Sequence, residues 1–389
     1  MNEKNIIYLD YQATTPLRPE VLKAMMPYFK EKYGNPHSNN HSLGKDANLA
    51  VEKAKKNIAS LINCEPEEII LTSGATESNN FAIKSIAESY GKEKIQIITL
   101  NTEHKCVIES CNFLEKRGYL VHYLEVEKNG IVNFLKLEKL IKDKMSLVSI
   151  MHVNNEIGVI QPVNEIGKLC KKYGGLFHTD AAQTFSCLNI DVKKNNIDAL
   201  SLSAHKIYGP KGIGALYVRR SIQNQIEPLI YGGGQQDNMR SGTLPTPLCV
   251  GFGTAASIFR GPQIRFITES IREKRDLFEQ LLRELEWQTK VNGPASERRH
   301  PCNANLQFPG FMSQDILAAL QPKLAASTGS ACTSGITEPS HVLRAMGLST
   351  DEAESSIRFS LGRHTTTSDV IEAVALIGQV LSDLSENLR

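Results

Sequence analysis

The sequence lacks the features that would point to a membrane or nucleic-acid partner. No apolar run approaches the about 20 residues of a bilayer-spanning helix. The 44 Lys and Arg residues nearly balance 42 Asp and Glu residues, and the net charge of +2 gives no electrostatic reason to bind nucleic acid or an anionic membrane. Internal repeats and low-complexity tracts are missing as well. These absences predict an ordinary globular protein.

Paired cysteines are also missing. The eight cysteines form no Cys-x-x-Cys pair and show no metal-ligand spacing. The first residues lack the basic-then-apolar layout of a secretory signal. We therefore expect reduced thiols, no bound metal and a cytoplasmic location.

One cysteine lies in an unusual context. Cys332 is surrounded by Ala, Ser, Thr and Gly over residues 325–335, with no hydrophobic period. A free cysteine is usually buried as a small hydrophobe, but these neighbours favour an exposed loop. The sequence thus indicates a nucleophile or a sulfur carrier, and an incidental surface thiol is the alternative.

The length of 389 residues favours two domains. In the first domain, short β-rich runs alternate with amphipathic stretches. This alternation predicts an α/β fold with a mostly parallel seven-stranded sheet. The expected strands are residues 68–71, 95–100, 121–126, 147–152, 176–180, 199–204 and 213–218. Residues 16–261 are expected to form this large cofactor-binding domain. Residues 1–15 and 262–389 are expected to form a smaller α+β domain that carries the Cys332 loop at about 325–336.

Two strand ends carry complementary side chains. Asp180 ends one expected strand, and Lys206 follows another. A lysine and an aspartate that converge are what pyridoxal phosphate requires, because the lysine holds the cofactor and the aspartate keeps its ring nitrogen protonated. Alone, each is equally consistent with a surface lysine or an ordinary acidic residue.

A turn suited to phosphate precedes the helical residues 78–87. Gly74, Ala75 and Thr76 join a strand to this helix, whose first N–H groups can bind an anion. Ser203 lies in the strand expected at 199–204, and His205 follows that strand directly. Side chains two positions apart point to the same side of a strand, so both could face the same phosphate. A turn of this kind is weak evidence by itself, since many helix caps look similar.

Several separate segments together resemble the cysteine desulfurases, which are pyridoxal-phosphate enzymes of fold type I in the class V aminotransferase family. The matching segments are residues 8–16, 72–80, 152–158, 203–212, 239–243 and 357–360. The resemblance runs from residue 8 to about residue 375, and residues 327–334 are similar to the loop of the group I (IscS/NifS-type) branch.

The resemblance implies a role for each matching side chain. Lys206 would be the Schiff-base lysine, whereas Lys211 would not. Cys332 would receive the sulfur, and His104 would stack on the cofactor and take part in proton transfer. Arg358 and Asn155 would bind the substrate. The remaining cofactor contacts would be Asp180, Gln183, Ala75, Thr76, Ser203, His205, Asn155 and, from a second subunit, Thr243.

The implied reaction takes sulfur from L-cysteine, leaving alanine and a persulfide on Cys332. The partners implied are a second subunit and sulfur-acceptor proteins for iron–sulfur cluster assembly or tRNA thiolation. One alternative is another fold type I enzyme, such as a selenocysteine lyase or an aminotransferase. A second is a degenerate relative that serves as a scaffold. Analysis of the reaction products would distinguish the first alternative from a cysteine desulfurase. Absence of yellow colour from the purified, cofactor-saturated protein would favour the second alternative.

The sequence departs from the family pattern in three places. Residues 235–238 follow three glycines but read Gln-Gln-Asp-Asn, and Gln12 replaces a smaller polar residue. The closing helix expected after Thr367 is followed by few residues, which puts docking of an iron–sulfur scaffold in doubt. We expect these departures to affect partner access more than catalysis.

Overall fold

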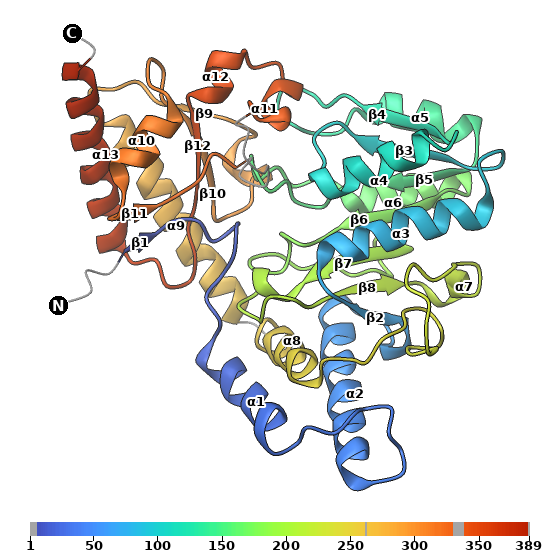
Figure 1. Cartoon of the computed structure of the whole chain (residues 1–389). Coiled ribbons are helices and arrows are strands. Elements are labelled where there is room, and N and C mark those ends of the chain that lie inside the picture. The colour runs from blue at the N-terminus through green and yellow to red at the C-terminus, as the bar shows by residue number, and fades with distance from the viewer. Residues whose placement is uncertain (1–5, 261–262, 330–337, 388–389) are drawn as a thin grey trace.

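The protein is described here from a computed structural model, which covers residues 6–260, 263–329 and 338–387. Its central element is a seven-stranded sheet in the order β2-β8-β7-β6-β5-β3-β4 (Figure 1). The strands are β2 (Ile69–Thr72), β3 (Gln96–Leu100), β4 (Leu120–Leu124), β5 (Ser146–Ser149), β6 (Leu176–Asp180), β7 (Ala199–Ser203) and β8 (Gly214–Val218). Within this sheet only β8 runs against its neighbours. The predicted α/β class and mostly parallel sheet are confirmed.

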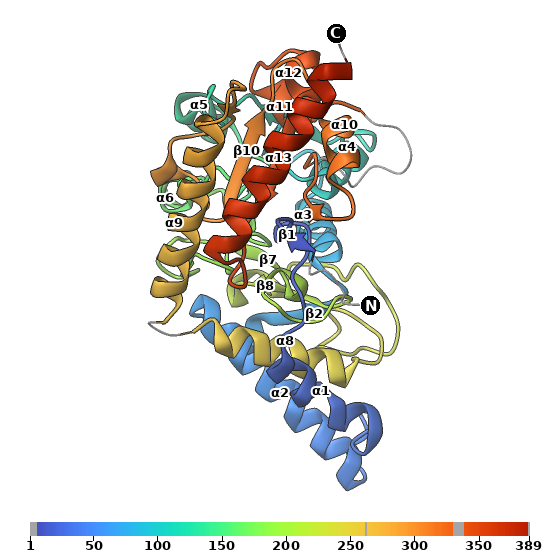
Figure 2. The ribbon, with the colours of Figure 1, turned by 90° about the vertical axis from the view of Figure 1, so that its left-hand side faces the viewer.

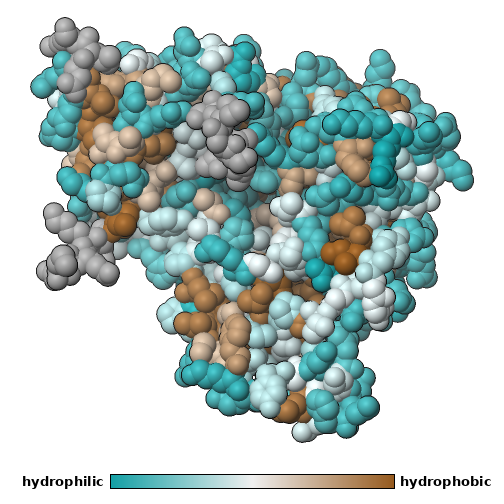
Figure 3. Space-filling model, viewed as in Figure 1, coloured by the Kyte–Doolittle hydropathy of each residue, from teal (hydrophilic) through white to brown (hydrophobic). Residues whose placement is uncertain are grey.

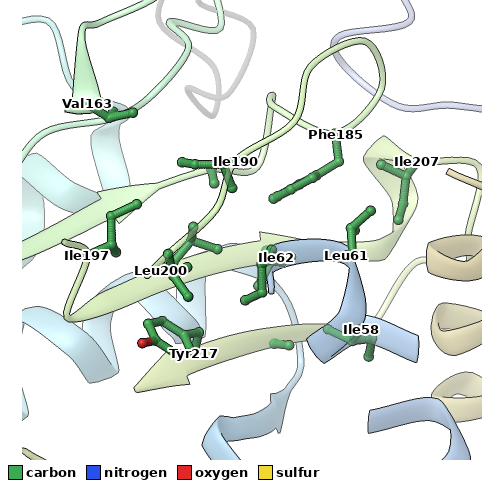
Figure 4. Packing of buried hydrophobic residues seen from close by; sticks show 14 of the residues in the cluster. Ile58, Leu61, Ile62, Val163, Phe185, Ile190, Ile197, Leu200, Ile207 and Tyr217 are labelled. Atoms are coloured by element: carbon green, nitrogen blue, oxygen red, sulfur yellow. The ribbon is translucent and has the colours of Figure 1, made fainter. Parts of the chain in front are cut away.

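Helices cover both faces of this sheet. The helices of this part of the chain are α1 (Pro19–Lys30), which packs on α8, and α2 (Ser42–Ile62), α3 (Ala75–Tyr90), α4 (Lys105–Glu115), α5 (Phe134–Asp143), α6 (Val163–Tyr173), α7 (Arg220–Gln223) and α8 (Thr246–Ile258). Strand residues alternate between two cores: Leu71 packs with Ile58 of α2, whereas Ile70 packs with Phe81 of α3. Figure 4 shows part of the first core, where Ile58 and Ile62 approach Leu200 and Tyr217. Burial on both faces explains why strands such as β2 and β8 are largely apolar.

The last third of the chain builds a smaller α+β layer around a three-stranded antiparallel sheet, β9-β10-β12. Its elements are α9 (Gln263–Arg283), β9 (Lys290–Val291), β10 (Asn303–Gln307), α10 (Ser313–Leu320), β11 (Leu324–Ala325), α11 (His341–Ala345), α12 (Thr350–Glu354), β12 (Ser356–Ser360) and α13 (Thr367–Asn387). In Figure 2, α9 and α13 lie across this sheet. The N-terminal β1 (Ile7–Tyr8) pairs with β11, so the chain's first residues join this layer. The domain boundaries at residues 16 and 262 stay a prediction.

The element boundaries differ from expectation where polar turns begin. The strand expected at 147–152 ends at Ser149, and the strand expected at 199–204 ends at Ser203. Residues Ala204–Lys206 form a 3₁₀ turn, because the amides of Ile207 and Gly209 both bond to the Ala204 carbonyl. His205 therefore does not continue the alternation of β7, and that part of the prediction is wrong.

No helix in the described part of the chain is long and apolar enough to cross a bilayer.

Candidate active site

A cavity of about 540 Å³ lies at the carboxyl ends of the parallel strands. The segments that follow β2, β3, β5, β6 and β7 each contribute to its wall, because parallel strands place their ends at one edge. Of the predicted site residues, the cavity is lined by Ala75, Thr76, His104, Asn155, Asp180, Gln183, Ser203, His205, Lys206 and Arg358. These residues span 283 positions of sequence (358 − 75), and the fold brings them together.

Two predicted residues are not among the lining side chains. Cys332 lies outside the described residues, although Gly329, three positions earlier, lines the cavity. Thr243 is exposed and does not line the cavity. The cross-subunit role of Thr243 stays a prediction.

The turn before α3 forms one end of the cavity. Ser73 to Thr76 all line it, and α3 begins at Ala75 without a side-chain cap. The backbone packs tightly here: a Cβ added at Gly214 would lie 2.7 Å from the Cα of Gly74. The uncapped N–H groups and the helix dipole make this end suited to an anion.

Lys206 and Asp180 reach the cavity from adjacent strand ends. The Lys206 ammonium donates to the Gln12 carbonyl at 2.5 Å and to the Ala13 carbonyl at 2.9 Å. The buried Asp180 carboxylate accepts from the Asn79 amide at 2.6 Å and from the backbone N–H of Ala182 at 2.9 Å. The predicted partner pair, an amine and a carboxylate, therefore lines one cavity.

His205 is kept neutral by its surroundings. Burial, then the Lys206 and Lys211 charges, lowers the pKa of His205 to about 4. Its Nδ1 lies 3.0 Å from the Thr14 hydroxyl. At neutral pH it can donate one hydrogen bond but adds no charge to the phosphate end of the cavity.

Arg358 is a buried arginine at the wall of the cavity. Its guanidinium donates to the Asp10 carboxylate at 2.7 Å, to the Ser327 hydroxyl at 2.8 Å and to the Asn155 carbonyl at 2.8 Å. The Nε atom is buried and has no hydrogen-bond partner among the described residues. Asp10 thus supplies the counter-charge to a guanidinium in the cavity wall.

Sequence reasoning missed two residues near Asp180 and His104. Asn79 bonds to Asp180, and the Cys106 thiol lines the cavity 3.0 Å from Nδ1 of His104. A signal was available for both: Asn79 lies three positions after Thr76 on one helix, and Cys106 lies two positions after His104. Gln12, which was treated as a minor departure, also lines the cavity.

Comparisons with known proteins agree with this geometry. The family model described as "Aminotransferase class-V" matches residues 7–372. The chain is 51% identical over 380 residues to "Cysteine desulfurase IscS" of Rickettsia bellii, which covers 98% of this chain and 92% of that protein.

Solved structures are similar over nearly the whole chain. A "NIFS-LIKE PROTEIN" has a TM-score of 0.90 and 36% identity, covering 97% of this chain and all of that one. "SspA in complex with cysteine" has a TM-score of 0.81 and 39% identity, covering 92% of this chain and 99% of that one. The protein therefore belongs to the class V aminotransferase family.

Proposed function

We infer that this protein is a cysteine desulfurase, which removes sulfur from L-cysteine with the help of pyridoxal phosphate and leaves L-alanine. One observation carries the inference: Lys206, Asp180, Arg358 and the start of α3 share a single cavity. That cavity belongs to a chain half identical, over 98% of its length, to a protein named as a cysteine desulfurase. The neighbour solved with cysteine supports the same substrate.

The described residues fit pyridoxal phosphate. The start of α3 with Thr76, Ser203 and His205 would hold the phosphate, Asp180 would face the ring nitrogen, and Lys206 would hold the cofactor's carbonyl carbon. Among the described residues the buried Oδ1 of Asn155 has no hydrogen-bond partner, and Asn155 lines the cavity, which suits a hydrogen-bond donor on a ligand. When bound, the cofactor supplies an electron-accepting ring that lets the amino acid lose its α-proton.

The protein's own residues would bind and orient the amino acid. Arg358 would receive the substrate carboxylate, and Asn155 would contact both cofactor and substrate. Lys206 would move the α-proton, a positioned transfer that is typically worth about 10²–10⁴ in rate. His104 is a second titratable group in the cavity wall.

Cys332 is the proposed sulfur acceptor. Its thiolate would attack the substrate sulfur, so that an S–S bond forms as the C–S bond breaks and the electron pair of that bond stays with the carbon. Protonation of that carbon gives alanine, and the persulfide stays on Cys332. Gly329 lines the cavity, and three residues span at most about 11 Å, which supports a reach from Cys332 to the substrate.

We also propose that the active enzyme is a homodimer and that it works in the cytoplasm. Figure 3 shows apolar side chains gathered in the region of α1, where Leu22 and Phe29 are 45% and 56% exposed. Tyr231, in the segment leading to Thr243, is 73% exposed. Exposed apolar surface of this kind favours a protein partner, and light scattering would show twice the chain mass of 43.1 kDa.

The sulfur acceptors proposed are proteins of iron–sulfur cluster assembly or tRNA thiolation. Selenocysteine lyase and aminotransferase activities are not favoured, since the relatives with high identity carry the desulfurase name.

A cysteine pulse tests the function. The cofactor-loaded protein should release alanine from L-cysteine and gain the mass of one sulfur on the peptide that contains Cys332. Cys332→Ser should lose the added sulfur and sulfide release, and Lys206→Ala should lose alanine formation. Cys64→Ser, at a half-buried thiol away from the cavity, is the matched control and should behave as the wild type. Native sulfide release by Cys332→Ser would refute the proposed role of that thiol.

A further inference from the structure

A line of hydrogen bonds joins the Asp180 carboxylate to the His104 ring. Asn79 Nδ2 lies 2.6 Å from Asp180 Oδ2 and 3.2 Å from Cys106 Sγ. The same sulfur lies 3.0 Å from His104 Nδ1. His104 is also the N-cap of α4, since its Nδ1 accepts the backbone N–H of Cys106 at 3.2 Å.

The direction of each bond follows from the chemistry of its ends. A carboxylate can only accept, so the atom of Asn79 that faces Asp180 must be the amide nitrogen. That nitrogen also faces Cys106, so Sγ accepts a bond from Asn79. The Cys106 S–H is then left to donate, and His104 Nδ1 lies 3.0 Å from the sulfur; the Thr76 hydroxyl is a second side-chain partner of this thiol.

Two donors therefore point at His104 Nδ1, the backbone N–H and the S–H of Cys106. A nitrogen that accepts them carries no proton, so the proton of the neutral ring belongs on Nε2. The start of α4 adds a positive dipole end, which disfavours a charged imidazolium.

The charges around His104 agree with a neutral ring. Burial is the main cause that lowers the pKa of His104, and the charges of Lys206, His341 and Lys105 act in the same direction. Asp180 opposes them. Burial likewise raises the pKa of Cys106 to about 12, so this thiol keeps its proton as a donor.

We propose that Cys106, held by Asn79, is a positioning residue that fixes His104 as the neutral tautomer with its proton on Nε2. His104 then offers a hydrogen-bond donor to the cavity that it lines, and removal of the α-proton falls to Lys206. The consequence for catalysis rests on the proposed function, whereas the tautomer depends only on the contacts above.

Nitrogen-15 NMR of the histidine-labelled, cofactor-loaded enzyme tests the tautomer. The His104 signals are assigned by their loss in His104→Gln. The wild type should show a protonated Nε2 and a bare Nδ1 from pH 6 to 8. Cys106→Ala keeps the backbone cap but removes the S–H donor, so it should shift the His104 titration to higher pH and admit the Nδ1–H tautomer. Cys106→Ser should restore the wild-type pattern, because a hydroxyl can also donate.

Cys111→Ala is the matched control. Cys111 is a buried thiol on the same helix, but it packs in the core and does not line the cavity. This variant should lower stability without moving the His104 signals. A protonated Nδ1 in the wild type, or equal His104 spectra for Cys106→Ala and the wild type, would overturn the proposal.

Alanine production is measured on the same samples to separate the two claims. A wild type that makes alanine but shows a protonated Nδ1 refutes the positioning role alone. A wild type that shows the expected tautomer but makes no alanine refutes the proposed function and supports the assignment of the tautomer.

Discussion

At the scale of single residues, Arg358 has two tasks in the structure. It would bind the substrate carboxylate, and it also holds Asp10, Ser327 and the Asn155 carbonyl together. Each of these contacts comes from a different segment, so the guanidinium links β12 to the cavity wall. A substitution of Arg358 should therefore weaken both substrate binding and the stability of the fold, and each effect can be measured by itself.

For Arg358→Gln we expect a higher KM for L-cysteine with a smaller change in kcat. Charge-assisted bonds are worth about 1.5–3 kcal/mol, which corresponds to roughly a 10- to 150-fold rise in KM. Steady-state kinetics measure it, and Arg358→Lys should recover only part of the loss because it lacks the planar fork. Arg219→Gln, at a partly exposed arginine beside Asp198, is the control with unchanged KM. A lowered kcat at constant KM would contradict carboxylate binding.

At the scale of elements, the segment from Gly232 to Gly242 is fastened to the edge of the large sheet. Gln236 uses its side-chain amide like a strand residue: Oε1 accepts from the Leu71 N–H at 2.7 Å, and Nε2 donates to the Leu71 carbonyl at 2.9 Å. Gln236, which belongs to the segment that departs from the family pattern, thus covers the open edge of β2. Arg240 adds a two-bond ion pair to Glu77 in the first turn of α3, at 2.8 and 3.2 Å.

The Arg240–Glu77 pair predicts an effect on cofactor affinity. Glu77 is a negative charge near the proposed phosphate site, and Arg240 compensates it. Arg240→Met should therefore weaken cofactor binding, by roughly tenfold for about 1.4 kcal/mol of uncompensated charge. The Arg240→Met, Glu77→Gln double variant should regain much of the affinity. Fluorescence titration of the apoenzyme with cofactor measures this, and equal losses in the single and double variants would contradict the explanation.

At the scale of the whole molecule, several histidines are buried in neutral form at the sheet and between the two layers. Burial lowers the pKa of four of them below the ordinary 6.5: His152 to about 4, His178 to about 3, His205 to about 4 and His300 to about 3. Burial also raises the pKa of the carboxyl groups of Glu103 and Glu156. The two sets act in opposite directions on the pH dependence of stability.

We expect stability to fall as the pH drops from 6.5 toward 4. In this range the four histidines bind protons in the unfolded state but not in the folded state, which lowers stability as the pH falls. The two buried carboxyl groups hold protons in the folded state and release them on unfolding, which opposes this effect. The pKa of Asp198 is also raised by burial, and the pKa values of His104 and His122 are also lowered, so lowered histidines outnumber raised carboxyl groups and the net effect of acidification is a loss of stability. Urea midpoints from pH 7.5 to 4.5 measure it.

Two variants make the pH experiment specific. His178 lies between β5 and β7, bonded to the hydroxyls of Ser149 at 2.8 Å and Ser201 at 3.1 Å. His178→Asn should make the free energy of unfolding less dependent on pH, by the contribution of about one proton. His37→Asn, at an exposed histidine, should leave it unchanged. Stability that is constant or rises on acidification would contradict the account.

Local sequence determined most of the elements. Strand β6 was predicted at its observed ends, where the apolar Leu176 and Phe177 begin the strand and the acidic Asp180 closes it. The 3₁₀ turn at Ala204–Lys206 was missed, since it depends on the Ala204 carbonyl accepting two later amides. These two hydrogen bonds are set by packing, and the alternation of apolar and polar side chains along the sequence does not predict them.

The sequence by itself determined which chemical groups the protein has and the strand ends on which they lie. Only the tertiary structure decided that Asn79 links Asp180 to Cys106, that Arg358 is shared with Asp10, and that Gln236 covers β2. The physical reason is that such bonds join residues from 27 to 348 positions apart. Their geometry is fixed by how the layers pack, whereas sequence patterns report only on neighbours along the chain.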